Sequence, residues 1–205
     1  VLSGRPPVYA LGLVFLGQFL DLFDGRAAEK WGSTPKGELF DDVADGTSFG
    51  LTAGLIVTIS FTQLWVGMLI GGLYVSATVY RLIRFVVEKR KQGILGGVTT
   101  FSGMPSPAGA LMVGTTCVLI SNDLVSGLIV AATSLLMISR VPYAHFGRTI
   151  LPKIPNVVKV LTLGAFLLLL ALGVHRDQYI APLIISFVSA LAYAGSPLFW
   201  AKTKK

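Results

Sequence analysis

The sequence predicts an all-α protein, a polytopic bundle of transmembrane helices, and two observations carry that prediction. Of its 205 residues, 53% are hydrophobic and only 13% are charged, and the mean hydropathy is +0.73. Ordinary soluble domains are roughly a quarter charged. Apolar runs long enough to cross about 30 Å of hydrocarbon recur along the whole chain. We therefore expect residues 1–205 to form a single integral membrane domain.

Seven apolar runs are expected to be spanning helices. The first ends at the dipeptide Asp24-Gly25, and a polar loop containing Gly32 and Pro35 follows it, as is typical of a helix end. Short polar turns near residues 62–63, 121–123 and 178 separate later runs. The predicted spans are residues 8–23, 37–61, 64–87, 107–120, 124–139, 156–174 and 179–199.

The basic residues predict the orientation of these helices. Alternating the spans leaves only Arg5 and Arg176 on one side of the membrane. By the positive-inside rule, the crowded side is cytoplasmic. This orientation places Val1 outside the cell, so we expect a further N-terminal helix to precede the sequence. The residues on the crowded side are Arg26, Lys30, Lys36, Arg81, Arg84, Lys89, Arg90, Lys91, Arg140, Arg148, Lys153, Lys159, Lys202, Lys204 and Lys205.

Four aspartates form the clearest candidate site. Asp21 and Asp24 are three residues apart at the end of one helix, and Asp41 and Asp45 are four apart on the next, so each pair shares a helix face. A carboxylate inside a membrane costs roughly 3 kcal/mol on insertion scales. Two opposed carboxylate faces at the cytoplasmic boundary would be compensated by bound cations, or more simply by water and neighbouring basic side chains.

Carboxylate oxygens favour hard divalent cations. We expect two ions, Mg²⁺ or Mn²⁺ with Ca²⁺ as a substitute, placed to clamp the attacking and leaving oxygens of a phosphoryl transfer. Zinc is disfavoured because no His or Cys lies nearby. Asp42 is rotated about 100° from Asp41 on a helix and is set aside, whereas Glu38 shares the face of Asp41 and Asp45 and could assist.

The acidic stretch resembles the CDP-alcohol phosphotransferase signature, DxxDGxxAR followed by eight residues and GxxxDxxxD. Two departures stand out: Glu29 replaces the arginine, and seven residues separate it from Gly37. The matching residues are Asp21, Asp24, Gly25, Ala28, Gly37, Asp41 and Asp45. Further segments, YRLIRF, FSGMPSPAGA, LLMISRVPY and YAGSP, resemble the phosphatidylserine synthase branch of that family.

This resemblance implies a reaction and roles for the residues that match. The reaction is transfer of a phosphatidyl group, or its archaeal counterpart, from a CDP-linked lipid to the hydroxyl of L-serine, with release of CMP. The lipid is CDP-diacylglycerol or CDP-archaeol. The four aspartates would hold the metals, and Asp45 is also the candidate general base. Gly25, Ala28 and Gly37 would line the cytidine-diphosphate site, and a homodimer is usual in the family.

Three further residues are candidates for binding the substrate. Arg81 and Arg84 share one helix face near the cytoplasmic end, where they could bind a carboxylate or a lipid phosphate, or simply snorkel to the membrane surface. Ser48 and the proline-containing loop at residues 103–107 are weaker candidates. The pair Gly67 and Gly71 permits close helix packing, within the chain or between subunits.

Several other functions are disfavoured. The net charge of +7 comes without a basic patch interleaved with aromatics, which argues against nucleic acid. Cys117 is the only cysteine, so no disulfide can form within the chain. His145 and His175 have no triad partner at a recognisable spacing. The alternatives are transfer to inositol phosphate, glycerol phosphate or another alcohol and, from a different class, cation transport.

Overall fold

The chain is mostly helical, in agreement with the prediction. A computed structural model describes residues 10–12, 14–17, 37, 43–91, 100–145, 149, 155, 157, 164 and 180–200. In chain order, its elements are the π-helix η1 (Gly46–Leu51), α3 (Thr52–Ser60), α4 (Leu64–Lys91), β1 (Thr100–Ser102), α5 (Ser106–Leu119), α6 (Asp123–Ile138), β2 (Pro142–Ala144) and α8 (Ile180–Trp200).

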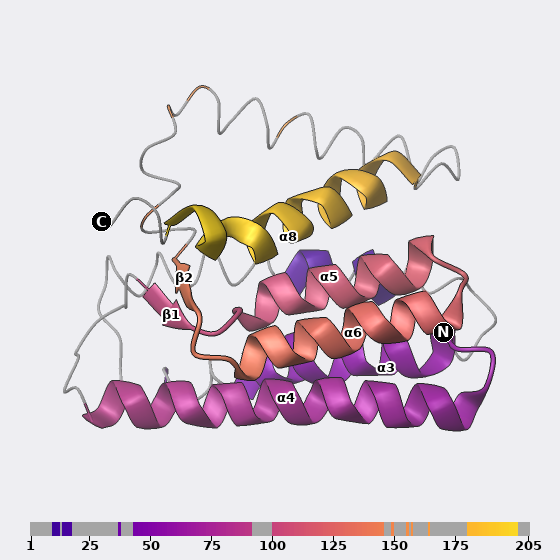
Figure 1. The fold of residues 1–205 in the computed structure, drawn as a ribbon, viewed down its shortest axis with the longest axis horizontal. Helices are drawn as coiled ribbons and strands as arrows, with labels where there is room; N and C mark the ends of the chain where they lie inside the picture. The colour runs from indigo at the N-terminus through magenta and orange to yellow at the C-terminus, as the bar shows by residue number, and fades with distance from the viewer. Residues whose placement is uncertain are drawn as a thin grey trace.

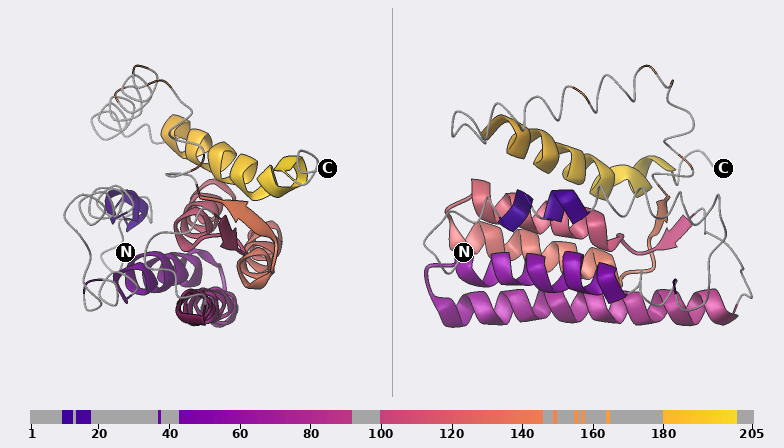
Figure 2. Two further views of the ribbon diagram at one scale, coloured as in Figure 1. Left: turned by 90° about the vertical axis from the view of Figure 1, so that its left-hand side faces the viewer. Right: turned by 180° about the vertical axis from the view of Figure 1, so that it is seen from behind.

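Four helices pack around a shared core. Figure 1 shows α3, α4, α5 and α6 running along one direction, with α8 crossing beside α5, and Figure 2 shows the same arrangement end-on and from behind. The helical residues 10–12 and 14–17 include Leu11, which lies against α5, since a Cβ at Gly114 would be 2.5 Å from Leu11 Cδ1. Fully buried side chains in this core include Leu11, Phe49, Ile56, Tyr74 and Val113.

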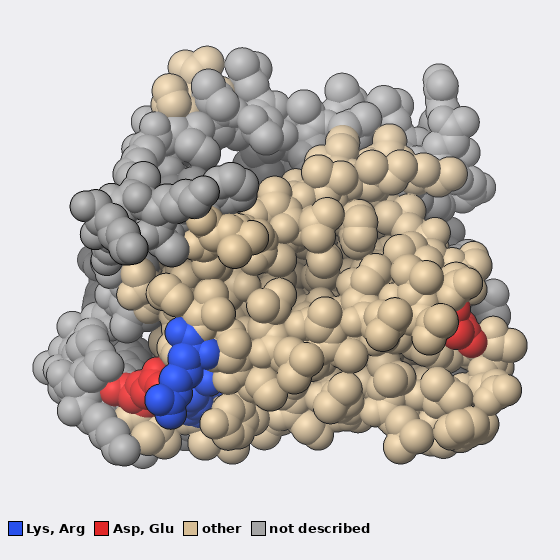
Figure 3. Space-filling model, viewed as in Figure 1, with Lys and Arg blue, Asp and Glu red and all other residues tan. Residues whose placement is uncertain are grey.

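Within the part of the chain that the structure describes, three helical segments are long and apolar enough to cross a membrane: Val43–Ser60, Leu64–Glu88 and Ile180–Leu198. The face drawn in Figure 3 agrees with this, because its described surface is an uncharged band with charged side chains only near the two ends. The protein is therefore a membrane protein. The helices α5 and α6 begin and end within one residue of the predicted spans, but at 14 and 16 residues they are about 21 and 24 Å long, short of the hydrocarbon thickness.

Seven spans are thus not confirmed. The predicted spans 8–23 and 156–174 lie mostly outside the described residues. The structure also lengthens α4, which continues to Lys91, because the charged residues after Val87 are good helix formers that can extend the helix into water.

One predicted helix has an irregular middle. The span predicted at 37–61 ends at Ser60 as expected, but residues 46–51 form the π-helix η1. Propensity and periodicity do not report a π turn, which depends on how the helix packs.

The turns at the end of the bundle away from Arg81 and Arg84 are short, as predicted. Residues 61–63 join α3 to α4, and α6 is capped by the side chain of Asn122, which accepts a hydrogen bond from the Val125 amide at 3.1 Å. Asp123 accepts the amide of Thr62 at 3.0 Å and so ties the two turns together. The carboxylate of Asp123 therefore has a structural role at this end of the bundle.

A small antiparallel sheet was not predicted. Strands β1 and β2 pair with Phe101 opposite Tyr143, and three-residue strands are too short to show alternating hydrophobicity. The sheet is joined to α8 by two reciprocal bonds: the Tyr143 hydroxyl donates to the Ala194 carbonyl at 3.1 Å, and that of Tyr193 donates to the Ala144 carbonyl at 2.8 Å. The segments SRVPY and YAGSP, distant in sequence, are therefore in contact.

The predicted close packing at Gly67 and Gly71 occurs within the chain, between α4 and α3. A Cβ at Gly67 would lie 2.1 Å from the Thr58 carbonyl oxygen, and one at Gly71 would lie 2.6 Å from that of Gly54. Both glycines are therefore used for intramolecular packing.

Candidate functional site

The described part of the candidate site lies at the end of the bundle where α4 and α6 finish and η1 begins. It contains Asp45, Ser48, Arg81 and Arg84; Gly37 is also described and is exposed. The predicted ligands Asp21, Asp24 and Asp41 and the predicted nucleotide-site residues Gly25 and Ala28 lie outside the described residues. Within the described residues, no three His, Cys, Asp or Glu side chains lie close enough together to bind one metal ion.

Asp45 stands immediately before η1 and is half-buried. Its carboxylate makes no capping hydrogen bond to the helix that follows. It lies close enough to the guanidinium of Arg81 to attract it electrostatically. The structure thus brings together two residues that the sequence selected for different reasons, 36 positions apart.

Arg81 is an arginine held inside the protein, with only 6% of its surface exposed. One terminal nitrogen, Nη1, donates to the Ser106 hydroxyl at 2.5 Å, and the guanidinium carbon lies 5.8 Å from the centre of the Phe101 ring. Its Nε is buried and has no hydrogen-bond partner among the described atoms. Because an unpaired buried donor on a charged group is costly, this edge of Arg81 is suited to an anionic ligand.

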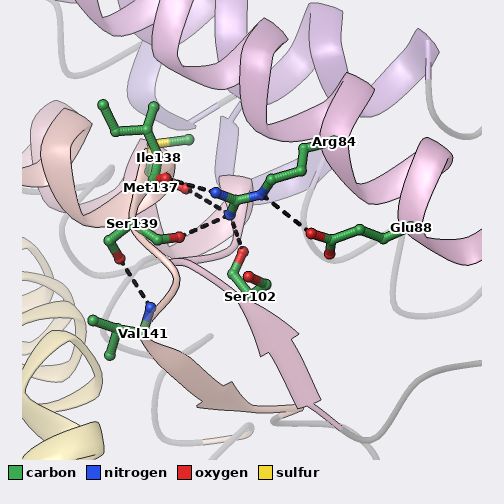
Figure 4. Close-up of polar contacts among 7 residues, drawn as sticks. All are labelled: Arg84, Glu88, Ser102, Met137, Ile138, Ser139 and Val141. Atoms are coloured by element: carbon green, nitrogen blue, oxygen red, sulfur yellow. Dashed lines mark hydrogen bonds and ion pairs between the residues drawn. The ribbon is translucent and has the colours of Figure 1, made fainter.

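Arg84 is oriented differently, although it is only one helical turn away. Its guanidinium donates to the carbonyls of Ile138 at 2.6 Å and Ser139 at 2.8 Å, and also to that of Ser102 (Figure 4). Nε lies 3.9 Å from a Glu88 carboxylate oxygen. These carbonyls belong to the C-terminal end of α6 and to β1, where a cation is favourable because helix-end carbonyls lack partners and carry partial negative charge. Arg84 therefore fastens α4 to α6 and β1.

The weaker candidates have clear positions. Ser48 is half-buried in η1 and faces the N-terminal segment, since a Cβ at Gly17 would lie 3.8 Å from its Cβ. In the loop at 103–107, Gly103 has φ of 85°, a conformation favourable for glycine. Pro105 occupies the N-cap position of α5 and Pro107 lies in the first turn, so the loop is a proline-rich helix start.

Sequence reasoning did not select Tyr74 or Phe101. Tyr74 is fully buried on α4, and its hydroxyl donates to the Phe49 carbonyl in η1 at 3.0 Å. Phe101 lies beneath Arg81 and stacks on His145 with ring centres 4.9 Å apart. Tyr74 lies in an apolar helix, where an aromatic residue is most simply interpreted as core, and Phe101 lies in a strand too short to be predicted, so the sequence carried no signal for either role.

Residues 2–141 match the family model for CDP-alcohol phosphatidyltransferases, which is more than half of the chain. The chain belongs to the CDP-alcohol phosphatidyltransferase family. The matched range contains the whole acidic stretch, Arg81, Arg84 and Ser106, and it ends just before β2. The protein is thus a phosphotransferase-family enzyme, and the resemblance noted in its sequence is confirmed.

Curated relatives agree on a narrower group within the phosphatidyltransferases. The chain is 28% identical over 185 residues to the CDP-diacylglycerol–serine O-phosphatidyltransferase of Methanocaldococcus jannaschii, covering 90% of this chain and 84% of the relative. It is 30% identical over 143 residues to the enzyme of that name from Bacillus subtilis, covering 67% and 75%. With the Mycobacterium tuberculosis enzyme, also of that name, it shares 28% over 198 residues, covering 91% and 66%.

Proposed function

We propose that this phosphatidyltransferase moves a phosphatidyl or archaetidyl group from a CDP-linked lipid to the hydroxyl of L-serine and releases CMP, with its active site facing the cytoplasm. Relatives that carry the serine enzyme's name align with most of the chain. The observation that carries the choice of acceptor class is Arg81, a buried arginine whose Nε edge has no partner among the described atoms. Serine, unlike a neutral alcohol, has a carboxylate to place there.

The reaction also implies divalent cations. Their ligands would be Asp21, Asp24, Asp41 and Asp45, of which only Asp45 lies in the described residues. A half-buried carboxylate at the membrane boundary, with only oxygen donors in the set, fits Mg²⁺ or Mn²⁺. When bound, such ions would neutralise the diphosphate and stabilise the departing CMP.

The protein's own residues have separable tasks in this proposal. Asp45 accepts the proton of the acceptor hydroxyl or holds that hydroxyl in line for attack. Arg81 binds the acceptor's anionic group, kept in place by Ser106 and the Phe101 ring. Arg84 does not need to touch substrate, because its contacts fix the end of α6 on which the site is built.

The family's homodimer stays a prediction for this chain. An interface, if formed, would not rest on Gly67 and Gly71, which pack α4 against α3.

The proposed reaction is tested by CMP release. We expect purified protein with Mg²⁺ or Mn²⁺ to release CMP from CDP-diacylglycerol or CDP-archaeol when L-serine is added, and to be inactive after chelation. A panel of inositol phosphate, glycerol phosphate and neutral alcohols tests the acceptor, because a phosphate would suit Arg81 as well as a carboxylate does. Preference for another acceptor would contradict the serine assignment, and failure to release CMP with any of the alcohols would contradict the transferase reaction.

The assignment of Arg81 makes a kinetic prediction. Arg81→Lys keeps the charge but loses the planar fork and its Nε donor. Losing one charge-assisted hydrogen bond of about 1.5–3 kcal/mol should raise the KM for serine roughly 10- to 100-fold, with a smaller change in the KM for the CDP-lipid.

The matched control is Arg140→Lys, at an exposed arginine just beyond α6. We expect it to retain both KM values. An unchanged serine KM in a folded Arg81→Lys protein would remove Arg81 from the acceptor site.

A further inference from the structure

The π-helix η1 changes the direction in which Asp45 points. The inner face of α3 is marked by its buried residues, among them Ala53, Ile56 and Val57. Asp45 precedes Val57 by 12 residues, which in an unbroken α-helix at about 100° per residue places the two about 120° apart.

A π turn closes i→i+5 bonds and so contains one residue more than an α turn. The extra residue reduces the effective separation of Asp45 and Val57 from 12 to about 11 α-helical residues, which corresponds to an angle of roughly 20°. Asp45 is thereby placed over the core-facing side of its helix, which agrees with its half-buried state and its proximity to Arg81.

The π turn is held by α4. The Tyr74 hydroxyl donates to the carbonyl of Phe49 in the middle of the turn at 3.0 Å, and both residues are buried. Close packing surrounds this bond: a Cβ at Gly50 would lie 3.1 Å from Thr78 Cγ2, and one at Gly46 would lie 3.3 Å from Leu82 Cδ2. At the end of the turn, the Thr52 amide and hydroxyl both bond to the Thr47 carbonyl, the hydroxyl at 3.3 Å.

We propose that the π turn Gly46–Leu51, held by the Tyr74 hydroxyl, sets the direction of the Asp45 carboxylate, and that Tyr74 is a positioning residue for the phosphatidyl transfer. This inference rests on the proposed function, because it gives Asp45 a task in that reaction. Tyr74 touches no reacting group and acts through the helix that carries Asp45.

The kinetic test is Tyr74→Phe, which removes one hydroxyl and keeps the ring in the core. We expect kcat for CMP release to fall about tenfold, with the KM for serine unchanged within about twofold, because Arg81 is left in place. The matched control is Tyr80→Phe on the same helix, where the side chain is 56% exposed, and it should keep wild-type kcat.

A second measurement, the rate of cysteine labelling, reports the direction of the side chain at position 45 and does not depend on enzymatic activity. In a Cys117→Ser background, the thiol of Asp45→Cys should react with a soluble maleimide about tenfold more slowly than that of Ala44→Cys, since residue 44 is exposed. Adding Tyr74→Phe should reduce this difference.

The possible outcomes separate this inference from the proposed function. If the wild-type protein releases CMP and a folded Tyr74→Phe protein keeps wild-type kcat and labelling rates, the positioning role is overturned while the reaction stands. If Tyr74→Phe does not fold, Gly50→Ala disturbs the same contact between η1 and α4 through a substitution in η1, and wild-type kcat and labelling in that variant would also overturn the proposal. Absence of CMP release by the wild-type protein would contradict the reaction itself, and the labelling comparison would still test the turn.

Discussion

Replacing Asp45 with asparagine is expected to lower the turnover of CMP release by about 100-fold or more while the protein stays folded. Asparagine has nearly the same shape, so packing beside η1 is preserved, but it carries no charge and cannot accept the proton of the acceptor hydroxyl. General-base contributions of this kind are typically 10²–10⁴-fold. The measurement is kcat in detergent or liposomes, together with a thermal unfolding curve of the same preparation.

The matched control is Asp123→Asn at the opposite end of α6. Asp123 accepts the Thr62 amide at 3.0 Å, and the asparagine side-chain oxygen can accept the same bond. Turnover should therefore remain within about twofold of the wild-type value. An active Asp45→Asn protein would remove this carboxylate from the mechanism.

Replacing Gly71 with alanine is expected to destabilise the protein strongly. The new Cβ would lie 2.3 Å from the Thr58 hydroxyl oxygen and 2.6 Å from the Gly54 carbonyl oxygen, and the second of these is a backbone atom that cannot rotate away. Overpacking of a tight interface costs about 1–3 kcal/mol or more. At about 2–4 °C per kcal/mol, a cost of 3 kcal/mol corresponds to a fall in Tm of about 6–12 °C.

The neighbouring glycine provides the control. A Cβ at Gly72 would meet nothing within 4 Å, so Gly72→Ala should leave Tm unchanged or raise it slightly, because alanine is the better helix former by about 1 kcal/mol. Equal melting of the two variants would contradict the close α3–α4 packing. The comparison is strict because the two substitutions are identical and adjacent in sequence.

The helices were predictable because their apolar runs are separated by strong local signals. Asn122 and the proline at 107 mark helix starts by side-chain chemistry that acts within a few residues, and α5 and α6 accordingly begin and end within one residue of the prediction. The end of α4 was less predictable. Hydropathy reports where the apolar stretch stops, whereas the helix continues through charged residues to Lys91.

The sequence alone determined the family, the membrane class and the cluster of acidic residues, because all three follow from composition or from residues close together in the chain. Only the tertiary structure decided which arginine keeps a donor without a partner among the described atoms. Arg81 and Arg84 are one turn apart and chemically identical, yet Arg84 binds the carbonyls that end α6, whereas Arg81 meets Ser106 and approaches Asp45. The π turn that directs Asp45 is likewise held by the hydrogen bond from the Tyr74 hydroxyl to the Phe49 carbonyl. These residues are 25 positions apart, so no local pattern reports the bond.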